Sequence, residues 1–121
     1  MSAIRENIGY EGVLEMSIER VDRKLIQERN EKHKEQALKA WKSLHEQLKD
    51  AGVEHVLFGS LKNGDFRAHS DIDVMVFGDL IDAEIRSTED VFSAVYREFG
   101  VKIDYLFAKH LSEEDVDRIL R

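Results

Sequence analysis

The sequence predicts an α/β (α+β) domain in which a small mixed sheet is flanked by helices and preceded by an N-terminal helical extension. Two patterns predict this class. Within residues 17–51, apolar residues recur at the three- and four-residue steps of an amphipathic helix. After Gly52 they fall instead into short runs that are typical of strands. The resulting order is helix, strand, strand, helix, strand, helix, which places helices against a sheet.

The first half of the chain is expected to be helical over residues 17–51, because Gly52 suits the position just after a helix end. Val21 with Leu25 or Ile26 forms a first apolar stripe, and a second contains Ala37, Trp41, Leu44, Leu48 and Ala51. The apolar positions near the start of the chain have no obvious place in the core of the second domain: Val13, Leu14, Ile18, Val21 and Leu25. Between the two stripes, QERNEKHKEQ (27–36) has no apolar face, so it is either a solvated helix or a break between two helices. We divide the chain there, into an N-terminal helical extension (1–33) and a second domain (34–121).

The second half contains three apolar runs that predict strands, at residues 55–58, 72–77 and 101–107. The four-residue spacing of Val91, Val95 and Phe99 predicts a helix near residues 88–99. Ser112 and the three acidic residues after it are typical of an N-cap and first turn, which predicts a final helix.

Asn63-Gly64 is a typical hairpin turn, and it could join two paired strands. However, residues 65–70 do not alternate between apolar and polar, and Gly59-Ser60 interrupts the first arm. A loop is therefore the favoured interpretation between the first two strands.

Composition excludes several classes of protein. The 121 residues include no cysteine, so neither disulfides nor a thiolate metal site can form. No stretch approaches the roughly 20 apolar residues of a membrane span, and the start of the chain lacks the apolar region of a signal peptide. The whole net charge of −7 lies in residues 53–121, which would repel a nucleic acid backbone. We expect a soluble, cytoplasmic protein that contacts no membrane and does not bind DNA directly.

Asp71 and Asp73 lie in and beside a strand that otherwise reads as buried, where acidic side chains are disfavoured. Because strand side chains alternate, the two point to one face, with Cα atoms roughly 7 Å apart. Asp104 faces away from its apolar neighbours in the third strand. If the second and third strands are neighbours, three carboxylates converge into an oxygen-ligand site suited to Mg²⁺.

The Gly59-Ser60 pair offers the complementary feature at the end of the first strand. Gly59 permits close backbone approach, and the hydroxyl and N–H of Ser60 can cradle phosphate oxygens. Lys62 would add a positive charge nearby. Taken singly, each acid and the Gly-Ser pair has an ordinary structural explanation as a turn or an edge-strand charge. The five histidines lack ligand spacing with one another and are interpreted as surface or packing residues.

GSLKNGDFRAHSDID, with Asp104 in VKIDYLF as a third acid, resembles the signature of the polymerase β-type nucleotidyltransferases. The resemblance covers about residues 36–120. The short chain is most similar to the minimal nucleotidyltransferases (MNT), including the antitoxins of HEPN/MNT toxin–antitoxin pairs. Lys62-Asn63 stands where the family commonly has an Arg-rich loop.

This resemblance implies transfer of a nucleoside monophosphate, AMP if the donor is ATP, to a hydroxyl group with release of pyrophosphate. It implies that Asp71, Asp73 and Asp104 are the catalytic residues and the ligands of two Mg²⁺ ions. Gly59 and Ser60 would hold the nucleotide's β and γ phosphates, with Lys62 as a further nucleotide-binding residue.

The acceptor of the nucleotide is predicted to be a partner protein. Only 17 residues follow Asp104, too few for the helical acceptor-binding domain of larger relatives. We expect residues 1–33 to dock a HEPN-type toxin, whose tyrosine accepts the nucleotide, or a second copy of the chain. Each of these predictions has an alternative. The acceptor could be a small molecule such as an antibiotic, or the protein could be a non-catalytic module that only binds its partner. The N-terminal helix could fold back on its own sheet instead of docking a partner.

Overall fold

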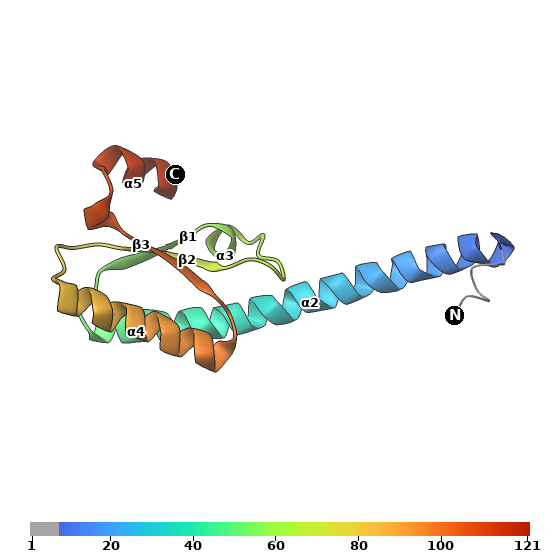
Figure 1. Ribbon diagram of the computed structural model, residues 1–121, viewed down its shortest axis with the longest axis horizontal. Coiled ribbons are helices and arrows are strands. Elements are labelled where there is room, and N and C mark those ends of the chain that lie inside the picture. Colours follow the sequence, from blue (N-terminus) through green and yellow to red (C-terminus); the bar gives the residue numbers. More distant parts are fainter. Residues whose placement is uncertain (1–7) are drawn as a thin grey trace.

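The computed structural model describes residues 8–121, with side chains from residue 23 onward (Figure 1). Its elements follow in chain order: α2 (Ile8–Asp50), β1 (His55–Phe58), α3 (Ser60–Asn63), β2 (Ile72–Val76), α4 (Asp82–Phe99), β3 (Ile103–Phe107), the 3₁₀ turn η1 (Ala108–His110) and α5 (Glu113–Leu120).

The three strands form one mixed sheet in the order β1-β2-β3. β1 runs antiparallel to β2, with His55 opposite Val76 and Phe58 opposite Asp73. β2 runs parallel to β3, and this pairing sets Asp73 opposite Asp104. The predicted α+β class with a small mixed sheet is confirmed, and each predicted strand is present, within two residues of its expected bounds.

One face of the sheet is covered by α2 and α4, which lie side by side in Figure 1. The core between these layers contains alternate residues of β2 together with apolar residues of both helices: Ile72, Val74, Val76, Leu44, Leu48, Phe92 and Val95. Alternation along β2 therefore turns Asp73 to the opposite face of the sheet. Figure 1 shows α5 on that side, near the far end of the strands.

Tyr105 joins β3 to α4. Its ring stacks on Phe92 with centroids 4.4 Å apart, and its hydroxyl donates a hydrogen bond of 2.7 Å to Oε2 of Glu89. This hydrogen bond, together with burial, raises the pKa of Tyr105 above its ordinary value of 10.0. Because Tyr105 follows Asp104 directly, the same contacts fix the backbone that carries this carboxylate.

α2 continues unbroken through residues 27–36. Of the two alternatives for this stretch, the solvated helix is therefore confirmed, and the break between two helices is wrong. α2 also begins at Ile8 instead of residue 17. Residues 23–29 are all exposed, including Leu25 at 42% and Ile26 at 54%, so this part of the helix does not fold back on the sheet. The other apolar positions near the start of the chain, Val13, Leu14, Ile18 and Val21, lie outside the residues whose side chains are described.

Between β1 and β2 the chain forms one helical turn, α3, followed by a loop. Gly64 ends that turn with φ +88°, a left-handed conformation that glycine adopts without strain. The alternative of a hairpin at Asn63-Gly64 is therefore wrong. The predicted loop is present, except that its first residues form the helical turn α3.

The two later helices show how acidic first turns mark helix starts. α4 begins at Asp82, earlier than the apolar spacing predicted, because Oε1 of Glu84 accepts the Ile81 N–H at 2.9 Å. The predicted N-cap of α5 is confirmed, since Oγ of Ser112 accepts the Asp115 N–H at 3.1 Å. Within the part of the chain that the structure describes, no helix combines the length and apolarity that crossing a bilayer requires.

Candidate active site

Three carboxylates gather at the start of β2 and β3. Asp73 and Asp104 are opposite each other across the parallel pair. Their preceding neighbours, Ile72 and Ile103, are buried in the core, so both acids face the other side of the sheet. Asp71 lies two residues before Asp73 and therefore on the same side. Asp71 and Asp73 are half-buried, while Asp104 is exposed.

Asp73 is the member of this group on which the charges of the other two carboxylates act. Burial raises the pKa of Asp73 above its ordinary value of 3.8, and the negative charges of Asp104 and then Asp71 raise it further. None of the ion pairs formed within residues 23–121 includes any of the three. Within residues 23–121, therefore, no basic side chain lies within ion-pair distance of these carboxylates.

Gly59 packs directly against Asp73. Its backbone has φ +76°, and a Cβ placed there would collide with Oδ2 of Asp73 and lie 3.0 Å from its Cγ. The β1–β2 register explains this contact, because Phe58, the residue before Gly59, pairs with Asp73. The side of Asp73 next to the β1–α3 junction is therefore kept free of any side chain from position 59.

The other two predicted phosphate-binding residues lie on α3. Ser60 is the first residue of this turn and is half-buried, next to Gly59. Lys62 is exposed near its end. The structure thus brings Gly59 and Asp73 into contact and places Ser60 beside them, whereas no described contact joins Lys62 to the carboxylates.

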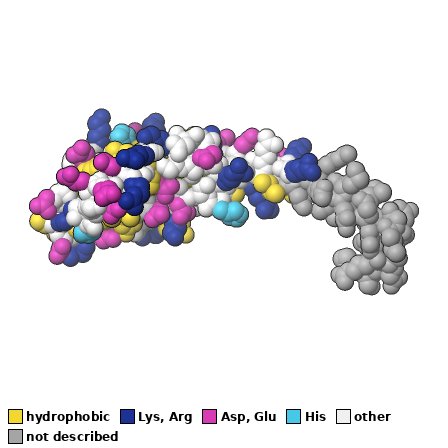
Figure 2. Space-filling view, turned by 90° about the horizontal axis from the view of Figure 1, so that it is seen from above, with side chains coloured by type: hydrophobic (Ala, Val, Ile, Leu, Met, Phe, Trp, Pro, Cys, Tyr) yellow, Lys and Arg dark blue, Asp and Glu magenta, His cyan; other side chains and the backbone are white. Residues whose placement is uncertain are grey.

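The surface around the site carries charges of both signs. Figure 2 shows acidic and basic side chains interspersed over the folded end of the molecule. The acidic excess of the second half is therefore not collected into one patch on the face seen in this view.

Comparison with known families places the chain in one of them. The profile of the nucleotidyltransferase domain matches residues 34–120, most of the chain and all of the sheet. The chain belongs to the nucleotidyltransferase domain family. No curated protein and no solved structure matches it at a significant level. Membership supports transfer of a nucleoside monophosphate from an NTP, which makes the protein a transferase.

The donor set of this nucleotidyltransferase domain fits a hard divalent cation, which members of the family generally use together with an NTP. Three carboxylates share one side of the sheet, and with no side chain at position 59 the central one lies directly against the Gly59 backbone. Among the residues with described side chains, no three His, Cys, Asp or Glu side chains are grouped closely enough to hold a metal ion by themselves. Mg²⁺ commonly takes only one or two protein carboxylates and completes its shell with water and substrate phosphates, so the fit does not require such a group.

Two polar residues near the nucleotidyltransferase site are not evident from the sequence. His33 and Asn30, both on α2, make hydrogen bonds to the loop that leads into Asp71. The sequence pattern indicated only a surface or packing role for His33. One signal was available in the sequence. Asn30 and His33 are three residues apart in a helical stretch, so their side chains lie on the same side of the helix. This stretch has no apolar face, but its polar side chains can still form hydrogen bonds to another part of the chain.

Proposed function

We propose that the protein is a Mg²⁺-dependent nucleotidyltransferase that moves AMP from ATP to a hydroxyl of a partner protein. The observation that carries the proposal is the group formed by Asp73, Asp104 opposite it and Asp71 on the same side, with Gly59 against the central carboxylate. Burial and the like charges of Asp104 and Asp71 disfavour ionisation of Asp73, so this carboxylate is suited to a site that receives a cation.

The proposed roles of these residues are those that the resemblance to the polymerase β-type nucleotidyltransferases implies. Asp71 and Asp73 would hold the metal ions on the triphosphate side, and Asp104 would hold the metal on the acceptor side. The backbone of Gly59 and the N–H and hydroxyl of Ser60 would orient the β and γ phosphates, with Lys62 at the periphery. Mg²⁺, when bound, would supply neutralisation of phosphate charge and a lower pKa for the acceptor hydroxyl. Catalysis by these residues is then mainly positioning and charge compensation.

Mg²⁺ with ATP is expected to stabilise the wild type much more than Asp71→Asn. A ligand that binds only the folded state adds RT ln(1 + [L]/Kd), about 2.7 kcal/mol at about a hundredfold excess over Kd. Thermal unfolding with and without Mg·ATP measures this. Asp90→Asn is the matched control, because Asp90 is an exposed acid of α4. Equal shifts in wild type and Asp71→Asn would mean that the nucleotide binds elsewhere.

The partner is proposed to dock on the exposed part of α2. Leu25 and Ile26 expose 42% and 54% of their surface, on a helix stretch that covers nothing within the described part of the molecule. Apolar side chains on a helix stretch that has no core to cover are available for contact with a partner. We propose a HEPN-type toxin as the occupant, with a toxin tyrosine as the acceptor and an antitoxin role for this protein. A second copy of the chain on the same surface is the competing occupant.

The decisive experiment incubates the protein with labelled NTPs, Mg²⁺ and the product of the neighbouring gene, and then identifies the labelled species. Label on the partner protein, strongest with ATP, supports the proposal. Label only on small molecules supports an antibiotic-type acceptor, and no label supports a module that acts by binding alone. L25D/I26D should lose partner labelling. Leu38→Asp, which changes a residue 48% exposed on the same helix, should keep it.

A further inference from the structure

Two side chains of α2 hold the loop that precedes Asp71. Nε2 of His33 lies 3.0 Å from the carbonyl oxygen of Ser70, and Oδ1 of Asn30 accepts the Ala68 N–H at 2.7 Å. A carbonyl can only accept, so His33 donates from Nε2.

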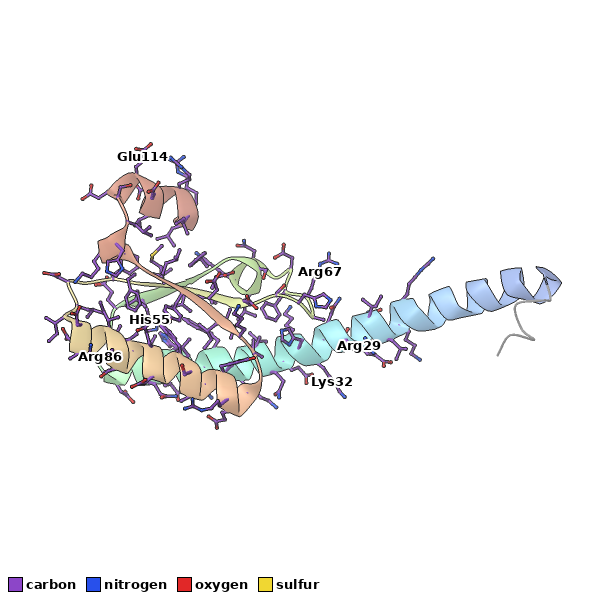
Figure 3. The ribbon with its side chains drawn as sticks, in the orientation of Figure 1. Arg29, Lys32, His55, Arg67, Arg86 and Glu114 are labelled. Atoms are coloured by element: carbon purple, nitrogen blue, oxygen red, sulfur yellow. The ribbon has the colours of Figure 1, made fainter. Side chains whose placement is uncertain are left out.

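The same loop is also fixed by packing and by its own turn. The ring of His33 stacks on Phe66, with centroids 5.0 Å apart and planes at 18°, and Phe66 is a buried core residue. Within the loop, the Arg67 N–H donates to Oγ of Ser70 at 2.9 Å, and the Ser70 N–H donates to the Arg67 carbonyl at 3.0 Å. Figure 3 shows this loop, marked by Arg67, above the part of α2 marked by Arg29 and Lys32.

Asp71 therefore sits between two anchored peptide groups. On its N-terminal side, the Ser70 carbonyl is bound by His33 of α2. On its C-terminal side, the Ile72 N–H donates to the Lys102 carbonyl at 2.9 Å. Lys102 lies two residues before Asp104 along the chain. The backbone at Asp71 is thus held between α2 and the segment that leads to the third carboxylate.

We propose that Asn30 and His33 are positioning residues for Asp71, acting through the backbone of residues 66–70. This inference rests on the proposed nucleotidyl transfer, and it extends the active site to a helix face outside the carboxylate group. Neither side chain contacts the reacting atoms. Their effect is to keep Asp71 at the distance from Asp73 and Asp104 at which shared metal binding is effective. A displacement of about 1 Å at such a site can cost about a hundredfold in rate.

Paired variants separate positioning from stability. His33→Phe keeps a ring to stack on Phe66 but removes the donor to Ser70, whereas His33→Gln places an N–H near the position of Nε2 without the ring. Asn30→Ala removes the acceptor of the Ala68 N–H, and Asn30→Asp keeps an oxygen there. His45→Phe is the matched control on the same helix. Nδ1 of His45 bonds to Nε2 of His55 at 2.8 Å, at the opposite end of β2 from Asp71.

Two readouts are taken on the full chain. In the absence of nucleotide, exchange of the Ala68 amide should be about fivefold or more faster in Asn30→Ala, which removes its acceptor. Exchange of the Ser70 amide, whose acceptor is the Arg67 carbonyl of the same loop, should be faster by a similar factor in His33→Phe, because the loop opens more readily once the Ser70 carbonyl loses its bond to α2. In the transfer assay, both variants should need about tenfold more Mg²⁺ for half-maximal rate, as expected for a displaced ligand. His33→Gln and Asn30→Asp should recover most of each loss, and His45→Phe should resemble wild type in both readouts.

Two results would overturn the positioning role. Unchanged exchange at Ala68 and Ser70 would mean that α2 does not hold the loop. Faster exchange with an unchanged Mg²⁺ requirement would mean that the loop does not govern Asp71. A wild type that transfers no nucleotide under any condition would instead refute the proposed function, and this is recognised before any variant is compared.

Discussion

Asp73→Asn is expected to abolish nucleotidyl transfer while leaving the fold intact. The carboxylate of Asp73 lies between the charges of Asp71 and Asp104, and a neutral amide at this position removes the central ligand of the proposed metal site. We expect kcat to fall at least about a hundredfold, the scale of losing one key electrostatic group in an active site. Initial rates with Mg·ATP measure the loss, and Asp90→Asn should retain wild-type rates. Undiminished transfer by Asp73→Asn would refute the site assignment.

The same substitution is expected to raise or preserve thermal stability in metal-free buffer. Because the folded state raises the pKa of Asp73, it binds this proton more tightly than the unfolded chain does. The wild type therefore loses stability as pH rises from the ordinary value of 3.8 through the raised value, whereas the amide variant lacks this titration altogether. Melting in EDTA should show the variant at or above wild type at about pH 7, with the gain shrinking towards pH 3.8. A collapse of the variant's stability at neutral pH would contradict this.

Gly59→Ala is expected to damage both stability and transfer. At φ +76° and ψ −154° the backbone lies in a region that essentially only glycine adopts, so a side chain is disfavoured by about 1–3 kcal/mol, and the new methyl group would also collide with the carboxylate of Asp73. The collision forces Asp73 or the β1–α3 junction to move, so transfer should fall by about a hundredfold.

Gly52→Ala is the matched control for this prediction. Gly52 has φ +73° with nothing within 4 Å of an added Cβ, so the variant carries the backbone strain without the collision. It should lose some stability from strain at its positive φ and keep its activity. Melting temperatures and initial rates of the two variants are compared. Equal activity in Gly59→Ala and Gly52→Ala would show that the contact between Gly59 and Asp73 has no effect on nucleotidyl transfer.

Local patterns predicted the parts of the fold that depend on periodicity. The alternation around Asp73 correctly turned it away from Ile72 and Val74, and the capping signal at Ser112 located α5. The start of α4 was missed because its first turn is held by Glu84, a polar cap that the apolar spacing does not show.

The remaining features depend on contacts between distant parts of the chain. The neighbouring positions of β2 and β3 could only be assumed from the sequence, because nothing local sets Asp73 opposite Asp104. The contact of His33 with Ser70 joins residues far apart in the chain, and polar pairs of this kind have no sequence period. The close approach of Gly59 to Asp73 likewise follows from the register of two strands, although the Gly-Ser pair had indicated that some close approach occurs there.

The length of α2 has a consequence for how the protein behaves in solution. At 1.5 Å per residue its 43 residues span about 65 Å, whereas a compact chain of 121 residues has a radius of gyration of about 14 Å. A monomer of this shape experiences more friction than a sphere of 14.0 kDa, so it elutes early from a sizing column and tumbles anisotropically. Elution volume would then overstate the mass and mimic a dimer. Light scattering or sedimentation equilibrium, which do not depend on shape in this way, are the measurements that distinguish self-association through α2 from a single elongated molecule.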